Sequence, residues 1–220
     1  MELRNLYNLD ETIAKELFQN AKYPWEILPK INEYILELGP KLDKNIFNQI
    51  DDNIWIAKSA KIAPTASITG PAIIDENAEI RHCAFIRGKV IIGKNSVVGN
   101  STELKNCILF NNVQAPHYNY VGDSILGFKA HMGAGSITSN VKSDKTNVII
   151  KGKEKIETNL KKVGAFLGDM VEVGCNSVLN PGTVIGKNSN IYPLSCVRGV
   201  IPENSIYKNK NVIVLKKAKI

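Results

Sequence analysis

An aliphatic or aromatic side chain recurs every six residues through the middle of this chain, and this period constrains the fold more than any other feature of the sequence. The run comprises Ile56, Ile62, Ile68, Ile74, Ile80, Ile86, Ile92, Val98, Leu104 and Phe110. An α-helix requires apolar spacings of three and four residues, and a simple strand requires a spacing of two. A strict spacing of six instead fits short strands joined at tight corners, with each sixth side chain pointing inward.

A second set of residues has the same period and lies four positions after the first. Apart from Ile108 its members are small or β-branched: Ala60, Ala66, Ala72, Ala78, Ala84, Val90, Ser96 and Thr102. Three hexads make a triangular coil, so residues three hexads apart stack at the strand spacing of roughly 4.8 Å. We therefore predict a parallel β-helix in which Ile56, Ile74 and Ile92 form one internal ladder.

The period is interrupted by two one-residue slips and one longer gap. It resumes in three blocks: Leu109, Ala115 and Val121; Leu126, Met132 and Thr138; and Leu167, Val173, Leu179, Ile185, Ile191 and Val197. We therefore expect the β-helix to occupy residues 51–220, with a loop insertion at about 142–165.

Residues 1–50 lack the six-residue period and have a helical pattern. Asp10 can cap a first helix, and Pro24 can open a second helix that ends at Gly39. Because the end coil of a solenoid exposes apolar surface, we predict that this helical cap covers an open end of the β-helix. A partner-binding module is the alternative.

Charge and cysteine content narrow the possible partners. The formal net charge is +7, but the lysines are scattered through loops and the tail, which favours a phosphorylated small ligand over nucleic acid. The four cysteines include no CxxC pair, no apolar run is long enough to span a membrane, and no secretion signal opens the chain. We expect a cytoplasmic protein without a membrane partner.

Two basic residues occupy equivalent positions in the repeat. Arg87 and Lys105 are three hexads apart, and each directly follows a periodic apolar residue. On adjacent coils they would stack and form a cationic pair suited to a phosphate group. Alternatively, they are two exposed charges without a ligand.

Two motifs further along the chain point to a family. The segment Ala115-Pro-His-Tyr-Asn-Tyr-Val-Gly-Asp123 is followed by Gly133-Ala-Gly-Ser-Ile-Thr-Ser-Asn140. With the basic pair, they resemble the acetyltransferase domain of the bifunctional N-acetylglucosamine-1-phosphate uridylyltransferase/glucosamine-1-phosphate acetyltransferases, and the archaeal sugar-1-phosphate nucleotidylyltransferases with a similar domain. The resemblance covers roughly residues 55–210. It implies a left-handed parallel β-helix, an all-β hexapeptide-repeat acyltransferase and a role in UDP-N-acetylglucosamine biosynthesis.

The resemblance also implies a reaction and a set of site residues. Acetyl-CoA would acetylate the nitrogen of an amino-sugar phosphate such as glucosamine 1-phosphate, with no metal, and His117 would be the general base. A neutral imidazole suits this role, because an amine arrives largely as an ammonium ion and must lose a proton before it attacks a thioester. The sugar phosphate would contact Arg87, Lys105, Tyr120, His131, Asn140 and Lys145. Acetyl-CoA would contact Ala134, Asn140, Val141, Cys175, Pro193 and Lys210.

The chain departs from the family pattern at three positions. His131 replaces an asparagine, Cys175 replaces a serine, and the lysine after Asn140 is displaced, with Lys145 or Lys142 as the candidate. These changes leave room for a different amino-sugar phosphate or another amine. The family's nucleotidyltransferase domain has no counterpart in this sequence, so we expect no pyrophosphorylase activity.

Three further expectations concern assembly and alternatives. A triangular solenoid has flat faces and no cleft for both substrates, so a neighbouring subunit must complete the pocket. The resembled family packs three prisms in parallel, which implies a homotrimer.

A γ-type zinc carbonic anhydrase would use three histidines, but His82, His117 and His131 lack the required spacing. The other alternative is a non-catalytic sugar-phosphate-binding protein, altered at His131 and Cys175.

Overall fold

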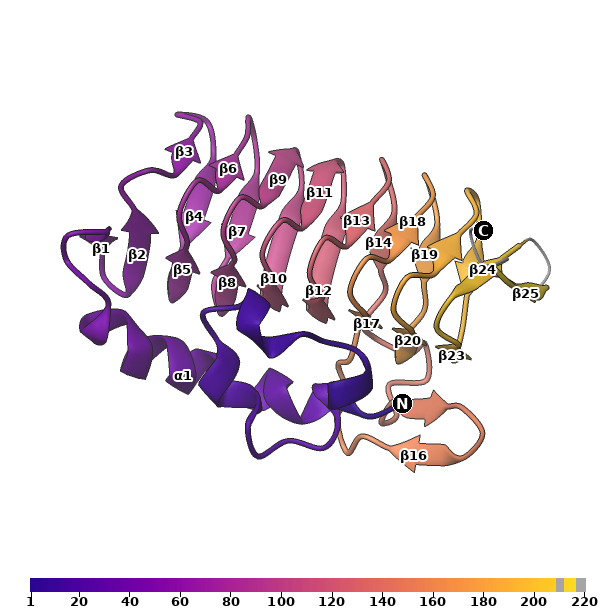
Figure 1. Ribbon diagram of the computed structural model, residues 1–220. Helices are drawn as coiled ribbons and strands as arrows, with labels where there is room; N and C mark the ends of the chain where they lie inside the picture. Colours follow the sequence, from indigo (N-terminus) through magenta and orange to yellow (C-terminus); the bar gives the residue numbers. More distant parts are fainter. Residues whose placement is uncertain (209–211, 217–220) are drawn as a thin grey trace.

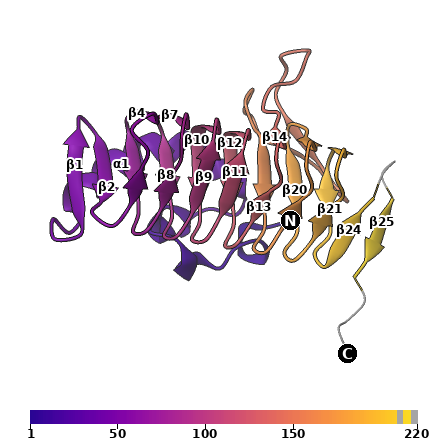
Figure 2. The same ribbon diagram turned by 90° about the horizontal axis from the view of Figure 1, so that it is seen from above.

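A computed structural model describes residues 1–208 and 212–216, which form a parallel β-helix with an N-terminal segment lying along one side (Figure 1). The coils follow one another in chain order from one end of the solenoid to the other (Figure 2). Within these residues no helix is long and apolar enough to cross a membrane.

The coils present three faces. The covered face comprises β2 (Ile54–Ala57), β5 (Ala72–Ile74), β8 (Val90–Ile92), the second halves of β10 (Glu103–Leu109) and β12 (Tyr120–Leu126), β17 (Ala165–Leu167), β20 (Thr183–Ile185) and β23 (Val200–Ile201). The site face comprises β4 (Ser67–Thr69), β7 (Phe85–Arg87), the first halves of β10 and β12, β14 (Ile137–Thr138), β19 (Val178–Leu179) and β22 (Cys196–Val197). Because β10 and β12 run across the corner between them, these two faces form one continuous hydrogen-bonded sheet.

The outer face is a separate sheet. It comprises β3 (Lys61–Ile62), β6 (Glu79–Ile80), β9 (Val97–Asn100), β11 (Gln114–His117), β13 (His131–Met132), β18 (Glu172–Val173), β21 (Asn190–Ile191), β24 (Ser205–Tyr207) and β25 (Ile213–Leu215). Its strands are parallel except for β25, which pairs antiparallel with β24. At the other end of the solenoid, β1 (Phe47–Asp51) pairs antiparallel with β2.

The predicted internal ladder is confirmed. Ile56 pairs with Ile74, and Ile74 pairs with Ile92. The ladder continues through Leu109. It does not continue through Phe110, the last member of the first set of residues spaced six apart. The reason is a shortened corner. Glu103 pairs with Phe85, which lies a full coil of three hexads earlier in the chain. Cys107 pairs with Val90, and this interval is one residue shorter, so one residue is missing from the corner between Glu103 and Cys107.

The small side chains predicted beside the corners do more than fill space. Ser96 and Thr102 are fully buried, and their hydroxyls donate to the carbonyl oxygens of Phe110 (2.9 Å) and Ala115 (3.1 Å). Each hydroxyl therefore satisfies a backbone group of the following coil, which apolar residues of the same size could not do.

The N-terminal segment is mostly 3₁₀-helical. It contains η1 (Leu3–Asn5), η2 (Leu9–Glu11), η3 (Lys15–Phe18), η4 (Pro24–Lys30), α1 (Ile31–Leu38) and η5 (Gly39–Lys41). Asp10 lies inside η2 and not at its cap, since the Asn8 side chain accepts the Asp10 N–H. We had expected this segment to cover an open end of the solenoid. It instead runs along the covered face (Figure 1).

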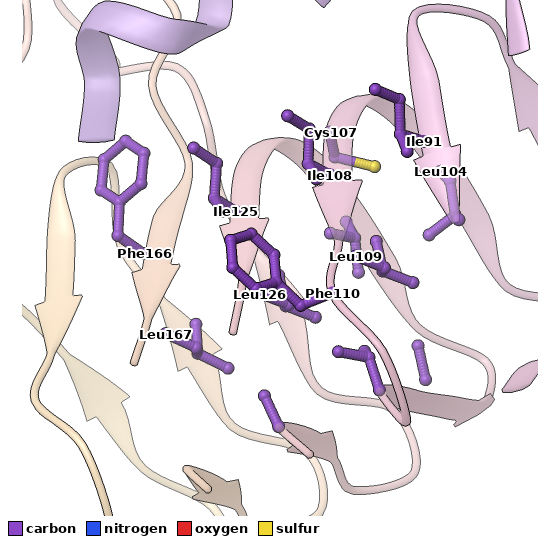
Figure 3. Packing of buried hydrophobic residues seen from close by; sticks show 14 of the residues in the cluster. Ile91, Leu104, Cys107, Ile108, Leu109, Phe110, Ile125, Leu126, Phe166 and Leu167 are labelled. Atoms are coloured by element: carbon purple, nitrogen blue, oxygen red, sulfur yellow. The ribbon is translucent and has the colours of Figure 1, made fainter. Parts of the chain in front are cut away.

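Outward-pointing apolar residues explain this placement. The covered face presents Ile73, Ile91, Ile108, Ile125 and Phe166 on its outer side, and all five are buried. In Figure 3, Ile108, Ile125 and Phe166 point away from the coil interior that holds Leu109 and Leu126. Trp25 packs on Phe166 with ring centroids 6.0 Å apart. The segment therefore buries a second hydrophobic layer outside the coils.

The expected insertion contains a two-stranded hairpin between β14 and β17. Its strands, β15 (Ile149–Lys151) and β16 (Lys155–Glu157), pair antiparallel. Val148 and Ile150 lie against Gly182, where φ is +78°, so the hairpin packs on the covered face beside β20.

Candidate active site

Arg87 and Lys105 lie on the site face in adjacent coils. Ile86 pairs with Leu104, and the basic residues directly follow them. Each cation faces a carboxylate: Arg87 Nη1 is 2.6 Å from Glu103 Oε1, and Lys105 Nζ is 3.9 Å from Asp123 Oδ2. The hydrogen bond to Glu103 raises the pKa of Arg87. Both cations are therefore balanced by carboxylates that a bound phosphate must displace.

Asp123 is the centre of a buried polar cluster. Its side chain is 6% exposed, and it accepts hydrogen bonds from Asn106 Nδ2 (2.8 Å) and Asn140 Nδ2 (2.5 Å). The strand register places Asn106, Asp123 and Asn140 at one corner of successive coils. Asp123 therefore fixes the orientation of Asn140 and lies beside Lys105.

Tyr120 completes the cluster. Its phenol oxygen accepts a hydrogen bond from Asn140 Nδ2 (3.2 Å), and its ring lies over Gly122, where a Cβ would come within 2.4 Å of that oxygen. Burial, followed by the negative charges of Asp123 and Glu103, raises the pKa of Tyr120. The phenol therefore keeps its proton near neutral pH and can donate it to a ligand oxygen.

His117 lies at a different corner of the coil, where the outer face meets the site face. It is the last residue of β11, it is exposed, and its backbone N–H donates to Asn119 Oδ1 (3.1 Å). Among the described residues, no hydrogen bond joins its imidazole to Tyr120 or Asn140. The candidate base and the basic cluster are therefore neighbours across the turn at Tyr118, without direct contact.

Three of the expected acetyl-CoA contacts line up with His117. Gln114 pairs with His131, His131 with Glu172, and Glu172 with Asn190. The same offsets place His117, Ala134, Cys175 and Pro193 on successive coils at one edge of the prism. We call this line of four residues the edge column, and at one strand spacing per coil it is about 14 Å long.

Neighbouring coils approach closely beside the edge column. A Cβ on Gly174 would lie 2.4 Å from the backbone nitrogen of Pro193, and one on Gly133 would lie 2.7 Å from that of Cys175. Glycines thus allow neighbouring coils to approach closely, and no side chain projects from these positions. An extended ligand arm could lie along this edge.

His131, Val141 and Lys145 belong neither to the cluster around Asp123 nor to the edge column. His131 is on the outer face, where its Nδ1 is 2.8 Å from Glu172 Oε2. Lys145 lies in a turn of the insertion, and Val141 forms an isolated bridge with Lys162. Lys210 falls outside the described residues.

Sequence reasoning missed both carboxylates of the cluster. Glu103 stands two residues before Lys105, so the alternation of a strand places both side chains on the same outer surface. Asp123 ends a motif that the sequence analysis quoted without giving this residue a role. Each would have been found by asking which acidic residues balance the paired cations.

The three histidines do not converge. His82 and His117 lie at the same edge of the prism, whereas His131 is on the outer face. Over residues 1–208 and 212–216, no three histidine, cysteine, aspartate or glutamate side chains gather closely enough to hold a metal ion. The geometry offers no support for the zinc-enzyme alternative.

The triangular parallel coils with their six-residue period define a hexapeptide-repeat β-helix protein. A family model described as the GMPPB C-terminal domain matches residues 68–212, and the chain belongs to this family. It is similar to the bifunctional protein GlmU of Methanococcus maripaludis (35% identity over 92% of this chain and 50% of the relative). A bifunctional sugar-1-phosphate nucleotidylyltransferase/acetyltransferase of Sulfurisphaera tokodaii is 30% identical over 84% of this chain and 47% of the relative. The resemblance inferred from the motifs is thereby confirmed, and the chain spans about half the length of these curated relatives.

Solved structures share the β-helix at much lower similarity. The polySia-specific acetyltransferase NeuO has a TM-score of 0.46 and 15% identity, and the match covers 77% of this chain and 91% of NeuO. AntD, an N-acyltransferase from Bacillus cereus in complex with dTDP-4-amino-4,6-dideoxyglucose and coenzyme A, has a TM-score of 0.40 and 17% identity, covering 80% of this chain and 93% of AntD. Similarity at this level carries no argument about substrate.

Proposed function

We propose that this protein transfers the acetyl group of acetyl-CoA to the nitrogen of an amino-sugar phosphate, such as glucosamine 1-phosphate, and that it has no pyrophosphorylase activity. The proposal depends chiefly on one observation, the position of His117 beside a cluster that contains Arg87, Lys105, Tyr120 and Asn140. The names of the curated relatives agree with this reaction class.

Each of these residues has a separate role in the reaction. Arg87 and Lys105 attract the phosphate, and the protonated Tyr120 donates to one of its oxygens. His117 takes a proton from the amine, whose nitrogen then forms a bond to the acetyl carbonyl carbon. The carbon–sulfur bond breaks, and CoA leaves as a thiol after taking up a proton. Asn140, held by Asp123, is positioned between sugar and donor.

Acetyl-CoA occupies the edge column in this proposal. Ala134, Cys175 and Pro193 extend from His117 along the edge column, so the thioester can reach the base while the arm lies against the coils. Asn140 and Val141 add contacts at the start of the insertion, and Lys210 and Lys145 remain candidate contacts for the donor and the sugar phosphate.

A homotrimer supplies the missing walls of the site. The pocket beside Asp123, of about 220 Å³, is lined by Lys89, Asn106 and Lys162 but not by Arg87, Lys105, Tyr120 or His117, so it does not enclose the proposed substrates. We therefore expect a mass near three times 24.3 kDa in light scattering. Mixing His117→Ala with Lys210→Glu subunits should restore part of the activity, because the family resemblance implies that the base and the acetyl-CoA contact at position 210 come from different chains. A fully active monomer contradicts the shared site.

A thiol-release assay tests the reaction itself. Acetyl-CoA is incubated with glucosamine 1-phosphate, other amino-sugar phosphates and unphosphorylated amines, and free CoA is measured. Release with a phosphorylated amino sugar supports the proposal. Sugar-phosphate binding without release identifies the non-catalytic alternative, and neither binding nor release with any member of the panel contradicts both.

A further inference from the structure

A thiol, an imidazole and a hydroxyl are in mutual contact at a corner outside the candidate active site. Cys83 Sγ lies 3.2 Å from His82 Nε2, and Thr65 Oγ1 lies 2.7 Å from His82 Nδ1. The Cys83 backbone N–H also donates to Thr65 Oγ1, at 3.3 Å. All three residues are exposed, so a reagent from solvent can reach the sulfur.

This arrangement has the parts of an activated nucleophile. The imidazole can take the thiol proton through Nε2, while its Nδ1–H donates to the Thr65 oxygen, which stabilises the imidazolium that forms. The resulting thiolate, and not the thiol, is the reactive form of cysteine. Cys83 adopts φ = +56°, a conformation rare for side-chain-bearing residues, and the corner thus holds its sulfur beside the adjacent histidine.

The other cysteines provide internal comparisons. Cys107 is fully buried, and burial raises the pKa of its thiol. Cys175 and Cys196 are exposed, and Cys196 Sγ accepts a hydrogen bond from Asn180 (3.2 Å). Across the described ranges, no imidazole contacts either of these two sulfurs.

The corner lies at the same edge of the prism as the edge column. Ile80 pairs with Val98, which places His82 beside Asn100, and Asn100 pairs with His117. His82 is therefore two coils from His117, about 10 Å along the edge.

We propose that Cys83 is a nucleophilic modification site that accepts an acyl group from an acyl thioester, with His82 as its base. The Cys83 sulfur forms a bond to the carbonyl carbon, the bond from that carbon to the leaving sulfur breaks, and the departing thiolate takes the proton from His82 Nε2. No oxidant is required. The identity of the donor as acyl-CoA rests on the proposed function, whereas the reactivity of the sulfur does not.

Competitive alkylation tests the reactivity directly. The protein is treated at pH 7 with limiting iodoacetamide and digested with trypsin, which releases the four cysteines in four different peptides. We expect Cys83 to react about tenfold faster than Cys175 and Cys196, because His82 lies within hydrogen-bond distance of the Cys83 sulfur and can take the thiol proton. His82→Gln should bring Cys83 to the rate of Cys175, and Thr65→Val should have a smaller effect. The matched control His131→Gln should leave the rate of Cys83 unchanged.

Acetyl-CoA replaces iodoacetamide in the second arm, without any sugar. One acetyl group should appear on the peptide that contains Cys83, be removed by hydroxylamine, and be lost in His82→Gln. The same experiment in His117→Ala, in which sugar acetylation should fall about 100-fold, should still label Cys83, so failure of the proposed function is distinguishable from failure of this inference. Equal alkylation of the exposed cysteines, or fast alkylation without acetylation, overturns the proposal.

Discussion

Replacing Asp123 by asparagine should destabilise the protein, and a second substitution should reverse the effect. The wild-type carboxylate accepts one amide N–H on each oxygen, from Asn106 and from Asn140. An asparagine at position 123 has only one acceptor oxygen, so with Asn106 and Asn140 in their present orientations its own amide group faces another amide donor. One charge-assisted hydrogen bond is lost, and one buried donor is left without a partner.

The size of the effect follows from these contacts. An unsatisfied buried donor costs roughly 1–3 kcal/mol, so we expect Asp123→Asn to lower the free energy of unfolding by about 2 kcal/mol. For a chain of this size the midpoint of thermal unfolding then falls by about 4–8 °C. Backbone strain does not contribute, because φ is +48° at Asp123 and +47° at Asn106, and both residue types tolerate this region.

The rescue uses the complementary change. In Asn106→Asp combined with Asp123→Asn, the carboxylate moves to position 106 and accepts from the new amide, whose oxygen still accepts from Asn140. Thermal melting followed by circular dichroism should show the double variant closer to wild type than either single variant. A double variant no more stable than Asp123→Asn alone would refute the assignment of Asp123 as the acceptor of both amides.

The remaining predictions concern the balance of charge, the base and pH. Glu103→Gln should tighten sugar-phosphate binding about threefold in titration calorimetry. The substitution removes a negative charge that repels the phosphate, while the glutamine oxygen still accepts the hydrogen bond from Arg87. His117→Ala should lower the acetyl-transfer rate about 100-fold with an unchanged melting temperature; near wild-type turnover would end its role as base. Burial, then Glu16, raises the pKa of Tyr34 from 10.0 to about 12. The folded protein thus holds this proton more strongly than the unfolded chain, and stability should fall between about pH 10 and 12, less so in Tyr34→Phe.

The sequence predicted the coil interior because every inward position meets the same packing requirement. Six-residue spacing identified Ile74 and Ile92, and it failed at Phe110 only because the corner after Leu104 is one residue shorter. The route of the N-terminal segment was missed because its binding surface is made of single outward residues, such as Ile73, next to each inward one. A short strand buried on both sides has no alternation that separates its two surfaces.

The candidate site was predictable where the repeat fixes the spacing. Arg87 and Lys105 were found because three hexads make one coil. His131 and Glu172 lie on opposite sides of the insertion in the sequence, so the repeat interval does not predict their ion pair. The hydrogen bonds of Asp123 likewise depend on a coil that is one residue shorter than three hexads, which aligns Asp123 with Asn106. The sequence reveals this alignment only when the position of the missing residue is known.

The central claim is that the basic cluster and His117 serve one reaction, and the ratio of kcat/KM for glucosamine 1-phosphate over glucosamine tests it most directly. The ratio is measured with acetyl-CoA in the wild-type protein and in the Arg87→Ala/Lys105→Ala variant. Loss of two cationic phosphate contacts should lower it by about 100-fold or more, since each charged hydrogen bond contributes roughly 1.5–3 kcal/mol, while kcat/KM for glucosamine stays within a few fold. A wild-type ratio near one, or an unchanged ratio in the variant, would show that the cluster does not hold the phosphate of the reacting sugar.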